Sequence, residues 1–345
     1  MTKHKIIQLI FFPLLVLGLL LSACQPTATQ APAITQPPAT VQTEPPQLVR
    51  VTLRLPWIVN AQFAGYYTAL EKGFFKEEGL EVEIRPGGID KNSITLVAAG
   101  EDTFGLHDTG SLLLARAQDI PLVAVATFYQ KHPGGVMALA DSGIKTLEDF
   151  KGKTIGFQEG GPWMLTKAML KANGISLDDV KTITVQYDIS PLLNGQVDLF
   201  TVFATNEPLI AKSQGKDTVV FLPADNGVPT ASDALFTTEE YLNRNPEVVR
   251  KMIKAIQRGW DYALKNKEEA IQFLAKYDPQ LDQELELMKL EAEEPFILTP
   301  ETQMNGIGYM TDEKWKTAYE VLRAEGGLEE DLDYTVAFTL EFVGK

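Results

Sequence analysis

The chain has 345 residues, of which 45% are hydrophobic and 22% charged, so its bulk is neither disordered nor polytopic in a membrane. The 46 acidic residues outnumber the 31 Lys and Arg, and the formal charge of −15 excludes the basic surface of a nucleic-acid-binding protein. A single Cys excludes an internal disulfide, and three His argue against a multi-His metal site.

The first 24 residues predict a lipoprotein signal peptide. Positive residues at 3–5 precede an apolar run at 6–21, which is short for a transmembrane helix of ~20 residues. The run ends in LSAC at 21–24, which resembles a bacterial lipobox. We therefore expect lipidation at Cys24 and a protein on the extracytoplasmic face of the cell membrane, held there only by its lipid anchor. A plain signal peptide with an incidental Cys is the alternative.

Residues 25–47 predict a tether. Six of these 23 residues are Pro, and Glu44 carries the only charge. Such a segment cannot bury apolar surface, and its prolines favour extended polyproline II. At ~3.1 Å per residue it spans roughly 70 Å when fully extended. A glycosylated stalk is the alternative interpretation, with the same geometry.

The body begins near Leu48 with alternating strand and helix patterns. Strands are predicted at 49–55, 80–84, 103–106 and, as a buried apolar run, 122–128. Helical periodicity separates them at 63–72, 93–99 and 112–117. This βαβαβ order predicts a parallel sheet with right-handed crossovers.

A second α/β series follows, with strands predicted at 154–157, 181–186, 199–203 and 219–222. The pattern from 239 to about 290 is helical, as is 315–322, and we expect these helices to pack on the first unit. The sequence thus predicts an α/β protein of two lobes. The expected boundaries are 48–133 plus 226–345 for one lobe and 134–225 for the other. Ligands prefer such interlobe clefts and the carboxyl ends of parallel strands.

Aromatic, amide and carboxylate side chains gather at the predicted strand ends. The candidate ligand-binding residues are Trp57, Asn60, Tyr66, Asp108, Thr109, Phe128, Tyr129, Gln130, Glu159, Gly160, Trp163, Asn206 and Glu207. Aromatic faces stack on flat rings, and amides and carboxylates read ring N–H and C=O groups. The pattern predicts a site for a flat, neutral heterocycle. The alternative is that the aromatic members are only core residues.

Catalytic motifs are not found at the predicted strand ends. The run Gly152-Lys153-Thr154 lacks the upstream glycine of a P-loop and precedes a strand instead of following one. His107 lies beside Asp108 without a partner nucleophile beyond Thr109 and Ser111. The paired carboxylates Glu293-Glu294 are interpreted as a solvated helix face. We therefore predict no catalytic residues.

Four stretches carry a family resemblance. They begin WIVNAQFAGYY at 57, FGLHDTG at 104, IKTLEDFKGKTIGFQEGG at 144 and NPEVVRKMIKAIQRGW at 245. Together they resemble the NMT1/THI5-like periplasmic substrate-binding proteins of ABC importers. The resemblance implies a type II periplasmic-binding fold that closes on a small molecule, an ABC permease and its ATPase as partners, and no metal or organic cofactor.

The family binds several ligands. Members that bind thiamine pyrimidines carry a motif similar to W-x-P-N-x-N-H after the first strand. This chain has WIVNAQF at 57–63, with Phe63 at the position of the His. Riboflavin, a larger flat ring with a polyhydroxyl tail, is the preferred prediction. A thiamine pyrimidine precursor, a sulfonate- or nitrate-type anion, or an enzyme of the same fold acting on a heterocycle remain alternatives. Pyrimidine synthases of this fold carry a cysteine cluster that a single Cys cannot supply.

Overall fold

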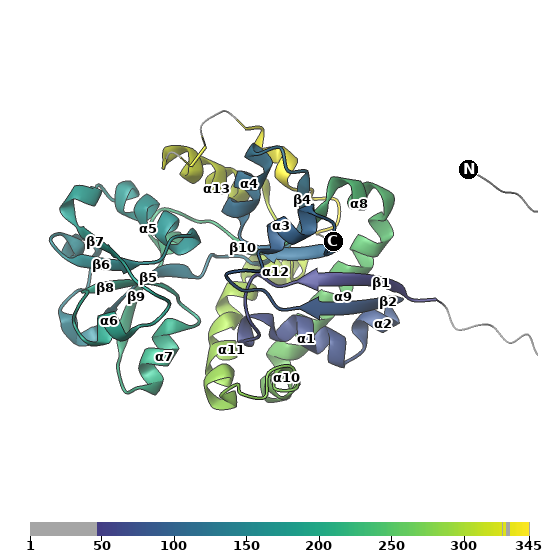
Figure 1. The fold of residues 1–345 in the computed structure, drawn as a ribbon, viewed down its shortest axis with the longest axis horizontal. Helices are drawn as coiled ribbons and strands as arrows, with labels where there is room; N and C mark the ends of the chain where they lie inside the picture. Colours follow the sequence, from purple (N-terminus) through teal and green to yellow (C-terminus); the bar gives the residue numbers. More distant parts are fainter. Residues whose placement is uncertain (1–46, 326, 329–331, 345) are drawn as a thin grey trace, which may run out of the picture. The chain divides into compact units, whose positions relative to one another are not determined.

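The computed structural model describes residues 47–325, 327–328 and 332–344 (Figure 1). The predicted signal peptide, the lipobox with Cys24 and nearly all of the predicted tether lie outside these residues. Among the helices described, none combines the length and the apolar character needed to cross a membrane. The body forms one compact unit from Pro46 onward.

The first sheet has the strand order β2-β1-β3-β10-β4. Its strands are β1 (Val49–Arg54), β2 (Leu80–Arg85), β3 (Phe104–His107), β4 (Leu122–Tyr129) and β10 (Ser232–Thr238). The four predicted strands run in one direction, as expected, but the sheet is mixed, because β10, which was not predicted, lies antiparallel between β3 and β4. The chain leaves this sheet after β4 and returns through β10 from the opposite direction. The start of β10 therefore lies at the edge where β3 and β4 end.

The helices that flank this sheet come from both ends of the body. They are α1 (Ala64–Glu71), α2 (Phe74–Glu77), α3 (Ser93–Ala98), α4 (Thr109–Ala117), α8 (Glu239–Arg244), α9 (Pro246–Lys265), α10 (Lys267–Leu274), α11 (Gln283–Ile297), α12 (Pro300–Asn305) and α13 (Asp312–Ala324). The buried side chains of α9 and α11 share one core with β1 and α1, so the predicted packing of the C-terminal helices on the first unit is confirmed. Glycines permit the closest approach, since a Cβ at Gly259 of α9 would lie 2.2 Å from the carbonyl oxygen of Gly65 in α1.

The second sheet has the order β7-β6-β8-β5-β9. Its strands are β5 (Gly134–Leu139), β6 (Thr154–Phe157), β7 (Lys181–Thr184), β8 (Leu199–Phe203) and β9 (Thr218–Phe221), with helices α5 (Gly161–Ala172), α6 (Ser190–Leu193) and α7 (Glu207–Ser213) around them (Figure 1). Short 3-10 helices lie at Ala61–Phe63, Ala140–Ser142, Leu147–Phe150, Leu177–Asp179, Pro223–Asp225 and Tyr334–Ala337. This sheet is also mixed, because β5 runs antiparallel to both of its neighbours.

Two segments, 130–133 and 222–231, connect the sheets, and hydrogen bonds hold them together. The backbone N–H of His132 donates to the carbonyl of Thr230 at 2.8 Å. The hydroxyl of Thr109 donates to the carbonyl of Ala231 at 3.0 Å. The two connections thus form a paired hinge between the two lobes, beside the start of α4.

Candidate functional site

An aromatic pair joins the lobes. Trp57 follows β1 in the first lobe, and Tyr187 follows β7 in the second. Their ring centroids are 5.4 Å apart and the planes are inclined by 48°. Tyr187 is 60% exposed, so most of its ring is accessible to a ligand. The sequence analysis missed Tyr187, although it lies just after a predicted strand, as Trp57 does.

Asp108 is the N-cap of α4, at the end of β3. Its Oδ1 accepts a hydrogen bond from the backbone N–H of Ser111 and its Oδ2 one from the Ser111 hydroxyl, both at 2.8 Å. His107 Nδ1 lies 2.8 Å from Oδ2. Burial alone would raise the pKa of Asp108, but the hydrogen bond and charge of His107 outweigh it and hold this pKa well below its usual range. The carboxylate is therefore ionised at neutral pH.

His132 lies in the hinge and is neutral. Burial lowers its pKa to about 4, against the opposing charge of Asp108. Its Nδ1 accepts a hydrogen bond from the backbone N–H of Gly134 at 2.8 Å, so the proton is on Nε2. A Cβ built on Gly161, the first residue of α5, would be 3.6 Å from this Nε2 and 3.9 Å from the Asp108 carboxyl carbon. The start of α5 thus meets both side chains.

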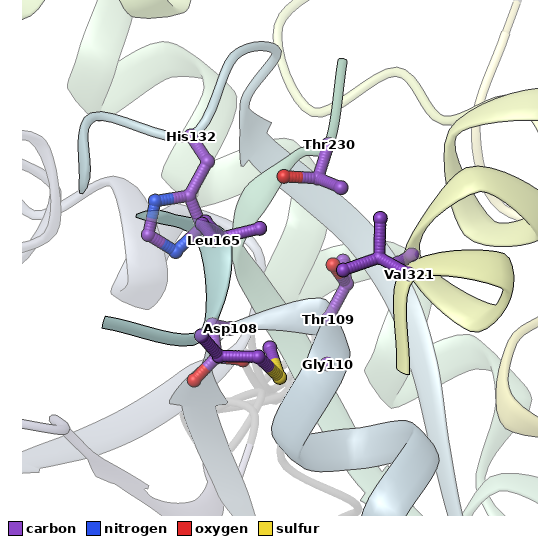
Figure 2. A pocket seen from close by; sticks show the side chains of 9 residues that line it. Asp108, Thr109, Gly110, His132, Leu165, Thr230 and Val321 are labelled. Atoms are coloured by element: carbon purple, nitrogen blue, oxygen red, sulfur yellow. The ribbon is translucent and has the colours of Figure 1, made fainter. Parts of the chain in front are cut away.

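A small cavity of about 10 Å³ lies at this junction (Figure 2). Residues from both lobes, the hinge and α13 line it: Asp108, Thr109, Gly110, His132, Met164, Leu165, Thr230, Ala318 and Val321. The buried hydroxyl of Thr230 has no hydrogen-bond partner among the described residues. The volume suits about one water molecule. A vitamin-sized ligand between the lobes would require them to separate.

Asp233 is the second residue of β10, at the same edge, and is not among the predicted site residues. Its Oδ1 accepts a hydrogen bond from Gln62 Nε2 at 2.9 Å, while Oδ2 has no partner in the described part of the chain. The residue is 2% exposed and has a left-handed backbone, with φ of 54°. Burial raises its pKa to about 7, although the Gln62 hydrogen bond acts to lower it.

Helix α11 brings a buried ionisable face to the site. Glu293 accepts hydrogen bonds from the hydroxyls of Tyr129, on β4, and Thr205, which follows β8 in the second lobe. Burial raises the pKa of Glu293 to about 8 despite these bonds. Two turns earlier, Glu286 accepts from Lys289 Nζ and from the backbone N–H of Ala61, both at 2.6 Å. The interpretation of Glu293 as part of a solvated face is wrong: it is 1% exposed, because α11 packs between the lobes.

Asn206 and Glu207 form a local pair at the start of α7. Glu207 accepts hydrogen bonds from the Phe203 backbone N–H at 2.8 Å and from Asn206 Nδ2 at 2.9 Å. Burial raises the pKa of Glu207, and these bonds together with the charge of Lys289 oppose that effect. The pair therefore lies near α11, which carries Lys289.

Several predicted site residues lie in the interior. Tyr66 and Phe128 are fully buried and meet edge to face, with ring centroids 5.5 Å apart. Trp163 stacks on Phe157 at 4.3 Å inside the core of the second lobe. The Gln130 side-chain amide donates to backbone carbonyls beside the hinge. These contacts hold the framework of the site.

The remaining candidates lie at the surface or in a turn. Asn60 caps the 3-10 helix at 61–63, accepting a hydrogen bond from the Gln62 backbone N–H at 2.9 Å. Glu159 and Gly160 are exposed just before α5. The structure thus brings Asp108 and the start of α5 together beside the hinge, whereas the contact between the lobes at Trp57 is made with Tyr187.

Comparisons with known proteins agree with this geometry. The chain is 31% identical to the riboflavin-binding protein RibY of Chloroflexus aurantiacus, over 94% of this chain and 95% of RibY. It is 28% identical to the formylaminopyrimidine-binding protein of Halalkalibacterium halodurans, over 85% of this chain and 90% of the relative. The aliphatic sulphonate binding protein SsuA of Escherichia coli has the same fold, with a TM-score of 0.67, 16% identity, and coverage of 85% of this chain and 92% of SsuA.

These comparisons confirm the predicted α/β, two-lobed periplasmic-binding-protein fold. The family model described as NMT1/THI5 like matches residues 60–270, which is more than half of the chain. The matched region runs from the loop after β1 through both hinge segments and into α10. The chain therefore belongs to the NMT1/THI5-like family.

Proposed function

We propose that this chain is the extracytoplasmic, lipid-anchored substrate-binding protein of an ABC importer, and that its ligand is riboflavin. The observation that carries the proposal is the similarity to RibY, which extends over nearly the whole of both chains. The site adds physical support. An aromatic ring from each lobe, Trp57 and Tyr187, suits a flat heterocycle.

Asp108 argues against an anionic ligand. The N-terminus of a helix such as α5 attracts anions through its free N–H groups. Here the ionised Asp108 carboxylate lies close to the Gly161 backbone, so a sulfonate or nitrate at this point would be repelled. A neutral ligand with hydrogen-bond donors fits better.

A thiamine pyrimidine precursor is the second candidate, favoured by the similarity to the formylaminopyrimidine-binding protein. Phe63 occupies the position of the His in the motif of the pyrimidine-binding members, and it is fully buried in the core. No imidazole is available there for a pyrimidine, which favours riboflavin.

The proposed mechanism is a clamp. The open lobes admit the ligand against Trp57, and the second lobe then closes with Tyr187, the Glu159 loop and the Asn206-Glu207 pair. The closed form is favoured because the ligand contacts both lobes only in that form, and the permease recognises the closed surface. Closure needs no chemistry on the ligand.

Equilibrium dialysis of the purified chain with riboflavin and with formylaminopyrimidine, followed by mass spectrometry of both compartments, tests the proposal. We expect riboflavin to accumulate with the protein and to be recovered unchanged. Preferential retention of the pyrimidine would replace riboflavin as the ligand, and a time-dependent change in ligand mass would identify an enzyme instead.

The lipid anchor has its own test. We expect a Cys24→Ser variant expressed in a bacterium to lose incorporation of labelled palmitate and to leave the membrane fraction. Incorporation of the label by Cys24→Ser at the wild-type level, or no incorporation by the wild type, would contradict lipidation at Cys24.

A further inference from the structure

Asp233 occupies a special place in the first sheet. In the register of β10, Ala234 pairs with His107 of β3, and Ser232 pairs with Tyr129 of β4. Asp233 therefore lies between the ends of these two strands, directly after the hinge segment 222–231. This is the edge of the first sheet from which the chain crosses to the second lobe.

The polar atoms around Asp233 are incompletely satisfied. One carboxylate oxygen is held by Gln62, whereas the other is buried and accepts no hydrogen bond from any described residue. The buried hydroxyl of Tyr66 also makes no well-aligned hydrogen bond to a described residue, although the indole of Trp260 and the charge of Asp233 both act on it. Buried polar atoms are nearly always paired, because leaving one unpaired is costly. Two such atoms in one region point to a group that arrives from outside the chain.

The backbone gives an independent indication. Among the described residues, Asp233 and Asp119 are the non-glycine positions with positive φ, at 54° and 59°. Asp119 is exposed in a turn, where this conformation is common. Asp233 is buried inside a sheet, where such a conformation carries strain that is typical of binding sites.

We propose that Asp233 and Tyr66 form a subsite of the first lobe that reads a hydroxyl group of the ligand. The free carboxylate oxygen of Asp233 accepts a hydrogen bond from the ligand hydroxyl, and the Tyr66 hydroxyl donates one to the oxygen of the same group. A hydroxyl both donates and accepts, so it satisfies both atoms, whereas a ring N–H or a carbonyl satisfies one. The inference rests on the proposed function and deepens it, since it assigns the polyhydroxyl tail of riboflavin to this subsite.

The subsite is formed before the lobes close. Asp233, Gln62 and Tyr66 all belong to the first lobe, on β10, the 3-10 helix at 61–63 and α1. Gln62 orients the carboxylate, and the packing of Tyr66 against Phe128 and Trp260 fixes its ring. Such preorganisation lowers the entropy cost of reading the ligand.

The test compares riboflavin with lumiflavin, which carries the same ring but a methyl group in place of the hydroxylated tail. Both are titrated into the full-length wild-type chain, Asp233→Asn and the control Asp119→Asn. Asn tolerates the left-handed backbone and keeps an acceptor for Gln62, but it replaces the free acceptor with a donor. We expect Asp233→Asn to weaken riboflavin binding by about tenfold or more and to leave lumiflavin binding within about twofold. Asp119→Asn changes neither.

Equal effects of Asp233→Asn on both flavins, or no effect, would overturn the subsite while leaving riboflavin as the ligand. A wild-type chain that binds neither flavin overturns the riboflavin proposal instead. The same variants are then titrated with hydroxymethylpyrimidine and its methyl analogue, where selective loss of the hydroxyl compound supports the subsite. Failure to bind either hydroxyl-bearing compound overturns both proposals.

Discussion

The edges of the two sheets nearest the hinge are built differently. In the first lobe Tyr129 and Asp233 are at most 2% exposed, and their hydrogen bonds are made within that lobe. In the second lobe Glu159 and Gly160, which follow β6, are exposed. From this contrast we expect the first lobe to supply the rigid, preformed half of the site and the second lobe the adaptable half.

Packing defects should therefore cost more in the first lobe. In Gly259→Ala the new methyl group would meet the Gly65 carbonyl between α9 and α1, and we expect a loss of ~3 kcal/mol or more in unfolding free energy. In Gly156→Ala of β6 the nearest atoms are Val197 methyl groups at 3.2 Å, and about 1 kcal/mol or less is expected. Urea denaturation of both variants measures the difference. A larger loss of unfolding free energy in Gly156→Ala than in Gly259→Ala would contradict the expected difference between the lobes.

The buried acids of the first lobe predict a pH dependence of stability. Burial raises the pKa of Glu293 to about 8, so the folded state binds a proton that the unfolded state has already released above its ordinary pKa. Stability should therefore fall as the pH rises from about 5 to 8, by at most ~1.4 kcal/mol per pH unit for this group.

Glu293→Gln should make that fall shallower, because its amide does not titrate but still accepts from Tyr129. The exposed Glu291→Gln on the same helix is the matched control and should keep the wild-type slope. Denaturation at several pH values measures the slopes. Identical slopes for wild type and Glu293→Gln would show that Glu293 does not titrate in this range.

Variants of the aromatic pair test how much each lobe contributes to ligand binding. Trp57→Ala should weaken riboflavin binding about tenfold, since a stacking ring is lost, and Tyr187→Ala should have a similar effect. The double variant should lose less than the product of the single effects, because the two rings act on one ligand. The exposed neighbour Ile58→Ala serves as the control. Full affinity in Trp57→Ala would remove this side chain from the site.

The smallest expected difference in ligand affinity is between carboxylate variants of the first and the second lobe. Asp108→Asn should weaken binding severalfold, whereas Glu159→Gln should change it by about twofold, because an exposed charge is screened by water. Binding isotherms at low and moderate salt measure both effects. A larger effect of Glu159→Gln would mean that the second lobe dominates recognition.

The sequence predicted most elements of the fold, and the misses have a common cause. The apolar run of β4 and the alternating residues of β1 and β2 match the structure closely. Strands β5 and β10 were not predicted, and both run antiparallel to the strands beside them. Residue patterns report burial and period, whereas strand direction depends on where the chain crosses between lobes.

The site was predicted in part for the same reason. Trp57 and Asp108 follow strands, so they were predicted from the rule that ligands bind at the carboxyl ends of parallel strands. Asp233 was not predicted because it lies near the start of an antiparallel strand, where that rule does not apply. Glu293 escaped because a charged helix residue beside another Glu has the pattern of a solvated face, and its burial depends on the packing of α11 between the lobes.

The most direct test of the account is a fluorescence titration of riboflavin with the purified chain. Flavin emission is quenched when the ring stacks on Trp or Tyr, so binding between Trp57 and Tyr187 is seen without a label. The account predicts saturable quenching at one riboflavin per chain with a Kd below about 1 μM. Unchanged flavin emission at protein concentrations far above that value would contradict it.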